Sequence, residues 1–326
     1  MISLDPISTA TLAAKKNHHD KLLPIIMQRV NDLPASELKT FLTDWRVSAI
    51  LSDTPEFLEE HHSNLLDSLK GYSIADWAEF IRKKGIRPSN RTLVEEALFY
   101  QYTNLVAEMN LVFRYTGGFA RKTSPYSAYD LAESLNIQTC TYCNRIYTKT
   151  VRNPSKITRP EFDHWFPKET YPLLALSFYN LIPSCHVCNS SVKRNTRMSL
   201  DDYIHPYVDS YLDYKFSYRI DKYNKYKFQI TRPLGSKEDT TIKAFKLEEI
   251  YTTHQNEIAD LVRLRKLYST KYLLQLRKLL SRSDQAISIE ELYRLAFGTY
   301  INEADFHKRP LSKMKKDILK ELNIIQ

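Results

Sequence analysis

Two Cys-x-x-Cys pairs constrain the fold of this chain more than any other feature of its sequence. The pairs Cys140-Thr-Tyr-Cys143 and Cys185-His-Val-Cys188 hold all four cysteines of the 326-residue protein. Four thiolates in two short-spaced pairs suit one tetrahedral zinc ion. Because four thiolates leave no open position for water, we expect a structural zinc that clasps the long segment between the pairs.

Two disulfides are the alternative explanation of the cysteines. The first residues, Met1-Ile-Ser-Leu-Asp-Pro6, lack the charged and apolar regions of a secretory signal. No apolar run approaches the roughly 20 residues that span a bilayer. We therefore expect a cytoplasmic protein without a membrane partner, in which the cysteines stay reduced and bind metal.

The composition and periodicity of the chain predict a mainly α-helical protein. Hydrophobic residues make up 43% and charged residues 26%, as in ordinary globular proteins, and there are six glycines. Apolar residues recur with helical spacing through the first part of the chain. The expected helices cover residues near 8–33, 35–51, 54–70, 74–85 and 91–115.

The pattern changes around the cysteines. Residues 146–151 are rich in β-branched and aromatic side chains, and we expect them to pair antiparallel with 158–162. A short helix over 189–194 would complete a small ββα unit. Farther on, residues 214–220 and 226–231 alternate with period two and predict a hairpin. Helices are expected over 246–280 and 311–322.

Four polar residues lie between and just after the cysteine pairs: Asp163, His164, Asn180 and Asn189. A lone histidine usually packs or forms a hydrogen bond, yet a neutral imidazole with a pKa of about 6.5 can take a proton from water. Asp163 offers a hard oxygen to a divalent cation. Each asparagine is also explained as a turn or cap residue, and Asn189 can both cap a helix and offer its amide oxygen.

In this order, the four polar residues and the two cysteine pairs resemble the zinc-bearing HNH endonuclease family. The resemblance implies a ββα-metal fold with one catalytic Mg²⁺ or Mn²⁺ ion. It implies that His164 is the general base, that Asp163 and Asn189 bind the catalytic cation, and that Asn180 braces the loop carrying the base. Asn189 stands where many members of the family have a histidine. The four cysteines match the zinc knuckle of the family.

The net charge of +9 is concentrated from residue 140 onward. A basic surface around a metal site indicates a polyanion such as DNA, although a solvated basic face is the alternative. Lys193, Arg194 and Arg197 follow the second cysteine pair and are candidate phosphate contacts.

A second basic segment runs over 263–282 without an acidic residue. It would contact nucleic acid, bind an acidic partner, or form a solvated face while its leucines point inward. The leucines expected to point inward are Leu264, Leu267, Leu274, Leu276 and Leu280.

A weaker resemblance extends beyond the motif. Ile204-His205-Pro-Tyr207, the hairpin and the helix start near 245–251 are similar to HNH proteins encoded beside ATPases in bacterial anti-phage systems of the Septu type. That resemblance implies an ATPase partner. For His205 it leaves two roles open, one near the active site and one in packing.

These observations predict a mainly α protein with a small α+β insert. We expect an N-terminal helical lobe (1–125), a zinc-stapled HNH core (126–210), and a hairpin with a C-terminal helical lobe (211–326). The predicted function is metal-dependent cleavage of DNA in anti-phage defence. The rival function is a zinc-supported nucleic-acid-binding or adaptor module that does not cleave.

Overall fold

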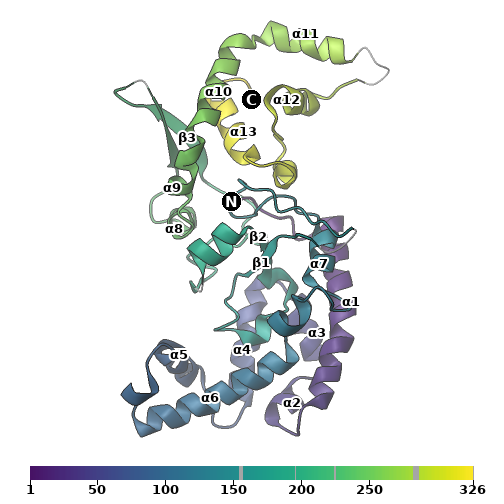
Figure 1. The fold of residues 1–326 in the computed structure, drawn as a ribbon, viewed down its shortest axis with the longest axis vertical. Coiled ribbons are helices and arrows are strands. Elements are labelled where there is room, and N and C mark those ends of the chain that lie inside the picture. The colour runs from purple at the N-terminus through teal and green to yellow at the C-terminus, as the bar shows by residue number, and fades with distance from the viewer. Residues whose placement is uncertain (154–156, 195, 224, 282–285, 326) are drawn as a thin grey trace.

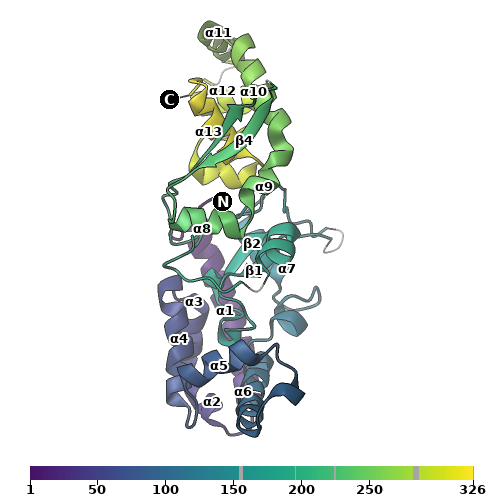
Figure 2. The same cartoon turned by 90° about the vertical axis from the view of Figure 1, so that its left-hand side faces the viewer.

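The computed structural model describes residues 1–326 except 154–156, 195, 224, 282–285 and 326. The described chain is mainly helical and carries two antiparallel two-stranded sheets. The molecule is elongated, with the N-terminal helices at one end and the C-terminal helices at the other (Figures 1 and 2). The first residues of the chain lie between these ends.

The N-terminal end is built from helices with one apolar face. They are α1 (Thr9–Asp32), α2 (Glu37–Phe41), α3 (Asp44–Ser52), α4 (Pro55–Ser68), α5 (Ile74–Lys83), α6 (Leu93–Val112) and α7 (Ala128–Leu135). In α1, buried residues recur every four positions, at Ala14, His18, Leu22, Ile26 and Val30. Because α1 contacts α3, α6 and α7, it is the central helix of this end.

The helices predicted near 8–33, 54–70, 74–85 and 91–115 are confirmed as α1, α4, α5 and α6. The single helix expected over 35–51 is two helices instead. Leu42 leaves the helical conformation, and the Thr43 hydroxyl accepts a hydrogen bond from the backbone N–H of Arg46 at the start of α3. This side-chain cap starts a new helix where the periodicity alone predicted continuation.

The strands expected over 146–151 and 158–162 do not form a ladder within the described residues. Val151 and Thr158 make one isolated antiparallel bridge. The strand that forms is β1 (Glu161–His164), and its partner is β2 (Leu181–Ser184), with Asp163 opposite Ile182. Strand pairing depends on the available neighbour more than on local propensity, and here β2 is that neighbour.

The segment around β1 and β2 also contains short helical turns. Two 3₁₀ turns, η3 (Pro172–Leu174) and η4 (Phe178–Asn180), lie in the loop between the strands. The turn after the second cysteine pair is η5 (Val187–Lys193), which is π-helical and starts earlier than the helix expected over 189–194. Other short turns are η1 (Pro88–Asn90), η2 (Tyr115–Phe119), η6 (Thr252–His254) and η7 (Glu303–Lys308).

The C-terminal end combines a hairpin with helices. β3 (Lys215–Ile220) and β4 (Tyr226–Thr231) pair antiparallel, which confirms the hairpin predicted from alternation. The helices are α8 (Lys237–Ala244), α9 (Leu247–Tyr251), α10 (Gln255–Leu267), α11 (Thr270–Leu280), α12 (Ile289–Phe297) and α13 (Ser312–Glu321). The helix expected over 246–280 is divided among α9, α10 and α11, because the Ser269 hydroxyl caps α11 by accepting from the Tyr272 N–H.

Backbone hydrogen bonds attach the start of the chain to the central segment. The Ile2 N–H donates to the Thr141 carbonyl (2.9 Å), and the Leu4 N–H donates to the Pro206 carbonyl (2.8 Å). The Thr141 N–H in turn donates to the Pro183 carbonyl in β2 (3.1 Å). The first cysteine loop therefore packs against β2. Among the described helices, none is long and apolar enough to cross a membrane.

Candidate metal centre and reaction pocket

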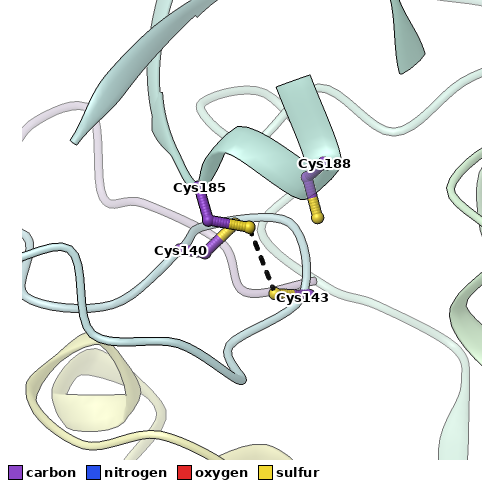
Figure 3. Close-up of side chains that lie close together, drawn as sticks. All are labelled: Cys140, Cys143, Cys185 and Cys188. Atoms are coloured by element: carbon purple, nitrogen blue, oxygen red, sulfur yellow. Dashed lines mark hydrogen bonds between the residues drawn. The ribbon is translucent and has the colours of Figure 1, made fainter. Parts of the chain in front are cut away.

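The four cysteines form a buried cluster (Figure 3). Their Sγ atoms all lie within 4.8 Å of one another, and the Sγ atoms of Cys143 and Cys185 are 3.9 Å apart. Sulfurs bound to a tetrahedral zinc at about 2.3 Å lie about 3.8 Å from each other. No disulfide joins the four cysteines, so the alternative of two disulfides is not realised. The cluster can bind a metal such as zinc.

Tight turns hold both cysteine loops around the sulfurs. The Cys140 carbonyl accepts a hydrogen bond from the Asn144 N–H (2.8 Å), and the Cys185 carbonyl accepts from the Asn189 N–H (3.0 Å). Asn144 has a φ of 49°, in the left-handed region that asparagine tolerates. The Tyr251 hydroxyl from α9 donates to the Cys143 carbonyl. The second loop leads directly into η5, so the cysteines position that turn.

A cavity of about 450 Å³ lies where β1 meets η5, and we call it the β1 pocket. Its lining combines polar, charged and aromatic side chains. They belong to Tyr115, Arg159, Glu161, Phe162, Asp163, His164, Pro167, Lys168, Glu169, Asn189, Ser190 and Arg194. Three of the four polar residues singled out in the sequence, Asp163, His164 and Asn189, therefore border one cavity.

His164 is fixed in this pocket by one hydrogen bond and one aromatic contact. Its Nε2 lies 3.0 Å from the Ala175 carbonyl oxygen. Because a carbonyl only accepts, Nε2 carries the proton and Nδ1 of the neutral ring is the acceptor. The Tyr115 ring packs edge-on at a centroid distance of 4.4 Å. Burial lowers the pKa of His164 to about 3, so the imidazole is neutral at neutral pH.

Asp163 takes part in a buried ion pair. The Lys193 ammonium lies 3.1 Å from its carboxylate and also donates to the His164 carbonyl at 2.7 Å. The Tyr142 hydroxyl donates to Oδ2 of Asp163. The side chain of Lys193 is 0% exposed and that of Asp163 is 3% exposed. Both cysteine loops thus contribute to this pair, since Tyr142 lies inside the first and Lys193 ends the turn after the second.

Asn189 is tied to Glu161, which the sequence analysis did not single out. Its Nδ2 donates to Oε2 of Glu161 at 2.9 Å, and the Ser190 hydroxyl donates to the same oxygen at 3.1 Å. His186 Nδ1 lies 2.8 Å from Oε1. Burial raises the pKa of Glu161, but the hydrogen bonds from His186, Asn189 and Ser190 outweigh it, and the pKa lies below its ordinary value.

Asn180 is fully buried and holds the loop that follows His164. Its Oδ1 accepts a hydrogen bond from the Phe166 N–H at 2.7 Å. Its Nδ2 donates to the carbonyls of Phe166 at 3.1 Å and Leu174 at 2.9 Å. These bonds hold both sides of the loop between β1 and β2. The same loop contains Ala175, whose carbonyl orients the His164 ring. Asn180 itself does not line the β1 pocket.

The three candidate phosphate contacts occupy different environments. Lys193 is buried against Asp163, so it does not reach a phosphate at the surface in this conformation, contrary to the prediction. Arg194 is exposed and lines the β1 pocket. Arg197 is exposed too, but its guanidinium lies 4.0 Å from Glu59 and over the Tyr171 ring, and it borders a separate cavity.

His205 is a packing residue. It is 0% exposed, its ring lies 4.7 Å from the Trp165 ring, and its Nδ1 accepts from the Tyr207 N–H at 3.2 Å. It does not line the β1 pocket. Of the two roles left open by the sequence, the structure supports packing.

The basic segment over 263–282 spans the end of α10 and all of α11, and Arg282 lies outside the described residues. The described cations of this segment are exposed. Leu264, Leu276 and Leu280 are partly buried as expected, but Leu267 is 64% and Leu274 is 57% exposed, so the prediction that these two point inward is wrong. The break at Tyr268–Ser269 changes the direction of the helical face between them.

Of three residues at or beside the site that the sequence did not single out, Glu161 and Tyr142 carried a local signal and Tyr115 did not. Glu161 lies two positions before Asp163, so strand alternation predicts that both lie on one face of β1. Tyr142 lies between Cys140 and Cys143, so its side chain is expected close to the segment that the two cysteine pairs bring together. Tyr115 had no local signal, because it reaches His164 through the tertiary fold.

Comparison with known proteins gives one partial relationship. Over 87 residues the chain is 36% identical to the Septu protein PtuB of Bacillus thuringiensis. The matched stretch covers 26% of this chain and 30% of that protein, so the chain matches less than a third of the relative's length. No protein-family model matches the chain. No solved structure matches it. Over the matched stretch, the chain is therefore linked by weak similarity to a Septu protein.

Proposed function

We propose that this protein is an endonuclease that hydrolyses phosphodiester bonds in DNA, with His164 as the general base. The observation that carries the proposal is the state of the imidazole. Its Nε2 is committed to the Ala175 carbonyl, and no hydrogen bond from the described residues uses Nδ1. A neutral ring held this way has one lone pair to accept a proton from water.

The proposed reaction needs one water molecule for each bond that is cut. The water oxygen attacks phosphorus while Nδ1 of His164 accepts a water proton. The bond from phosphorus to the leaving oxygen breaks, and that oxygen then takes a proton, so the products are a phosphate monoester and a hydroxyl end. With a pKa of about 3 the ring alone is a weak base, but an adjacent phosphate anion raises this pKa by favouring the protonated ring.

A divalent cation such as Mg²⁺ or Mn²⁺ belongs to the same proposal. Oxygen donors from Asn189 and from the carboxylates of β1 suit such a hard ion. Asn189 Oδ1 forms no hydrogen bond with the described residues, whereas the charge of Asp163 is shared with Lys193. Asn189 would therefore be the less committed of the two expected ligands. When bound, the cation would stabilise negative charge developing on the phosphate.

Positive side chains at the β1 pocket support a nucleic-acid substrate. Arg159, Lys168 and Arg194 line it, and the chain carries a net charge of +9. Cations placed around a reaction centre fix the phosphate backbone while leaving base identity unread. In this proposal the cysteine cluster binds a structural zinc, because four thiolates leave no coordination site for substrate.

The similarity to a Septu protein supports a setting in anti-phage defence. The resemblance of this chain to HNH proteins encoded beside ATPases supports an ATPase as partner. Co-purification of the chain with the product of an adjacent ATPase gene tests this part of the proposal. A protein that stays monomeric and cuts at its full rate without that product would reject the partnership.

A plasmid-nicking assay with Mg²⁺ or Mn²⁺ tests the catalytic proposal. We expect His164→Ala to cut at least about 100-fold more slowly than wild type, because general-base catalysis contributes that much or more. His61→Ala is the matched control, since His61 bonds Asp53 and does not line the β1 pocket. Equal cutting by wild type and His164→Ala would reject His164 as the base. DNA binding without any cutting by wild type would favour the non-cleaving module.

A further inference from the structure

We propose that Glu161 is a positioning residue that directs the side-chain oxygen of Asn189 into the β1 pocket as a cation ligand. This inference rests on the proposed function. Glu161 lies on β1 and is partly buried, and Asn189 lies on η5. Both border the β1 pocket, and the 2.9 Å bond from Asn189 Nδ2 to Glu161 Oε2 joins the strand to the turn.

The chemistry of the two groups sets the orientation of the amide. An ionised carboxylate only accepts hydrogen bonds, so it fixes the NH₂ group of Asn189 on its own side. The amide oxygen then points away from Glu161. A neutral partner that can also donate would remove this preference and let the amide turn over.

Three donors hold the Glu161 carboxylate itself in place. His186 lies between Cys185 and Cys188, and Asn189 and Ser190 directly follow Cys188. This stretch of chain therefore fixes the Glu161 carboxylate, and the carboxylate in turn fixes the amide of Asn189. Because Lys193 neutralises Asp163, the direction of the Asn189 oxygen matters more for cation binding than it would beside a free carboxylate.

Mn²⁺ binding, followed by electron paramagnetic resonance on zinc-loaded full-length protein, tests this role without measuring cleavage. We expect Glu161→Gln to weaken Mn²⁺ binding by about 10- to 100-fold, as the loss of groups that orient metal ligands does. The Mn²⁺ affinity of Glu161→Asp should lie between that of Glu161→Gln and that of wild type. Glu169→Gln removes an equal charge from the pocket lining without touching Asn189, and we expect a smaller change.

A double-mutant cycle separates positioning from direct ligation. If Glu161 acts through Asn189, Glu161→Gln has no further effect on Mn²⁺ affinity in an Asn189→Ala background. Additive losses, equal losses in Glu161→Gln and Glu169→Gln, or a wild type that binds no Mn²⁺ would each overturn the inference. Zinc content and melting temperature confirm that each variant is folded. The expected Mn²⁺ pattern in a protein that leaves plasmid uncut would reject the nuclease proposal and retain this one.

Discussion

The ammonium of Lys193 lies 3.1 Å from the carboxylate of Asp163, and both side chains are buried. The Tyr142 hydroxyl and the His164 carbonyl complete the contacts of the pair. A buried charge is stable when it is paired and hydrogen-bonded, and costly when its partner is removed. This pair therefore joins β1, η5 and the first cysteine loop into one unit.

Replacing Lys193 by methionine should strongly destabilise the protein. The change leaves the Asp163 carboxylate buried without a counter-charge, and we expect a loss of about 3–5 kcal/mol in the free energy of unfolding, measured with urea. Adding Asp163→Asn removes the unpaired charge, so the double variant should recover part of the loss. A double variant no more stable than Lys193→Met would contradict this account. Lys168→Met removes a more exposed ion pair with Glu169 and should cost about 1 kcal/mol or less.

Stability should fall as the pH is lowered below about 6.5, because buried histidines stay neutral in the folded state. Burial lowers the pKa of His18 to about 4 and the pKa values of His62 and His205 to about 3. Between those values and 6.5 the unfolded chain binds more protons, so each histidine lowers the unfolding free energy by up to about 1.4 kcal/mol per pH unit of acidification. Above that window the three groups contribute no pH dependence.

Urea midpoints at pH 7, 6 and 5 check this expectation. His62→Phe keeps an aromatic ring against Trp77 and Tyr171 while removing one titrating group, so its stability should depend less steeply on pH than that of wild type. Protonation of the four cysteines affects both proteins alike and cancels in the comparison. Parallel pH curves for wild type and His62→Phe would show that His62 does not titrate on unfolding.

Pure reduced protein should contain about one zinc per chain, bound by the four cysteines. Removing it with a chelator should lower the melting temperature, because metal binding and folding of such a site are coupled. Cys185→Ser should have the same effect, whereas Ser191→Ala, on the exposed side of η5, should leave both zinc content and melting temperature unchanged. Metal analysis that finds no zinc in wild type would reject the structural site.

Arg194 and Arg197 form a matched pair for testing the path of DNA. Arg194 lines the β1 pocket, whereas Arg197 lies beside Glu59 and Tyr171 at another cavity. We expect Arg194→Ala to weaken DNA binding and to reduce the salt dependence of the binding constant by about one phosphate contact. Arg197→Ala should bind nearly as wild type. Fluorescence anisotropy at several salt concentrations measures both, and equal losses would place DNA on both surfaces.

Helical periodicity predicted most of the N-terminal end, because the apolar face of a helix depends only on the spacing of apolar residues within that helix. The breaks at Thr43 and Ser269 were not predicted, since each depends on whether a hydroxyl caps a new helix or points to solvent. Local propensity also chose the wrong partner for the strand at 158–162. The observed partner, β2, lies against the first cysteine loop through the Thr141 bond to Pro183, a contact between distant segments.

At the site, the resemblance to HNH endonucleases implied that Asp163, His164 and Asn189 act together, and all three border the β1 pocket. The burial of Lys193 was not predictable from a basic stretch, because it depends on a carboxylate that arrives from β1. Glu161 escaped notice for a similar reason. From sequence alone, a single glutamate in a strand is expected to face solvent. Its role becomes visible only in the structure, where Asn189 and Ser190 of η5 donate hydrogen bonds to it.

The π-helical turn from Val187 to Lys193 sets the spacing between the cysteine cluster and the residues of the β1 pocket. The cysteine cluster fixes the start of the turn at Cys188, the buried ammonium of Lys193 fixes its end, and Asn189 lies between them. One residue inserted or deleted along it would rotate the later side chains by roughly a quarter of a turn. Substitutions on the exposed side of this turn should cost little stability. An insertion or deletion would move the pocket residues relative to the cysteine cluster. Divergent relatives should therefore keep the length of this turn while varying its exposed residues.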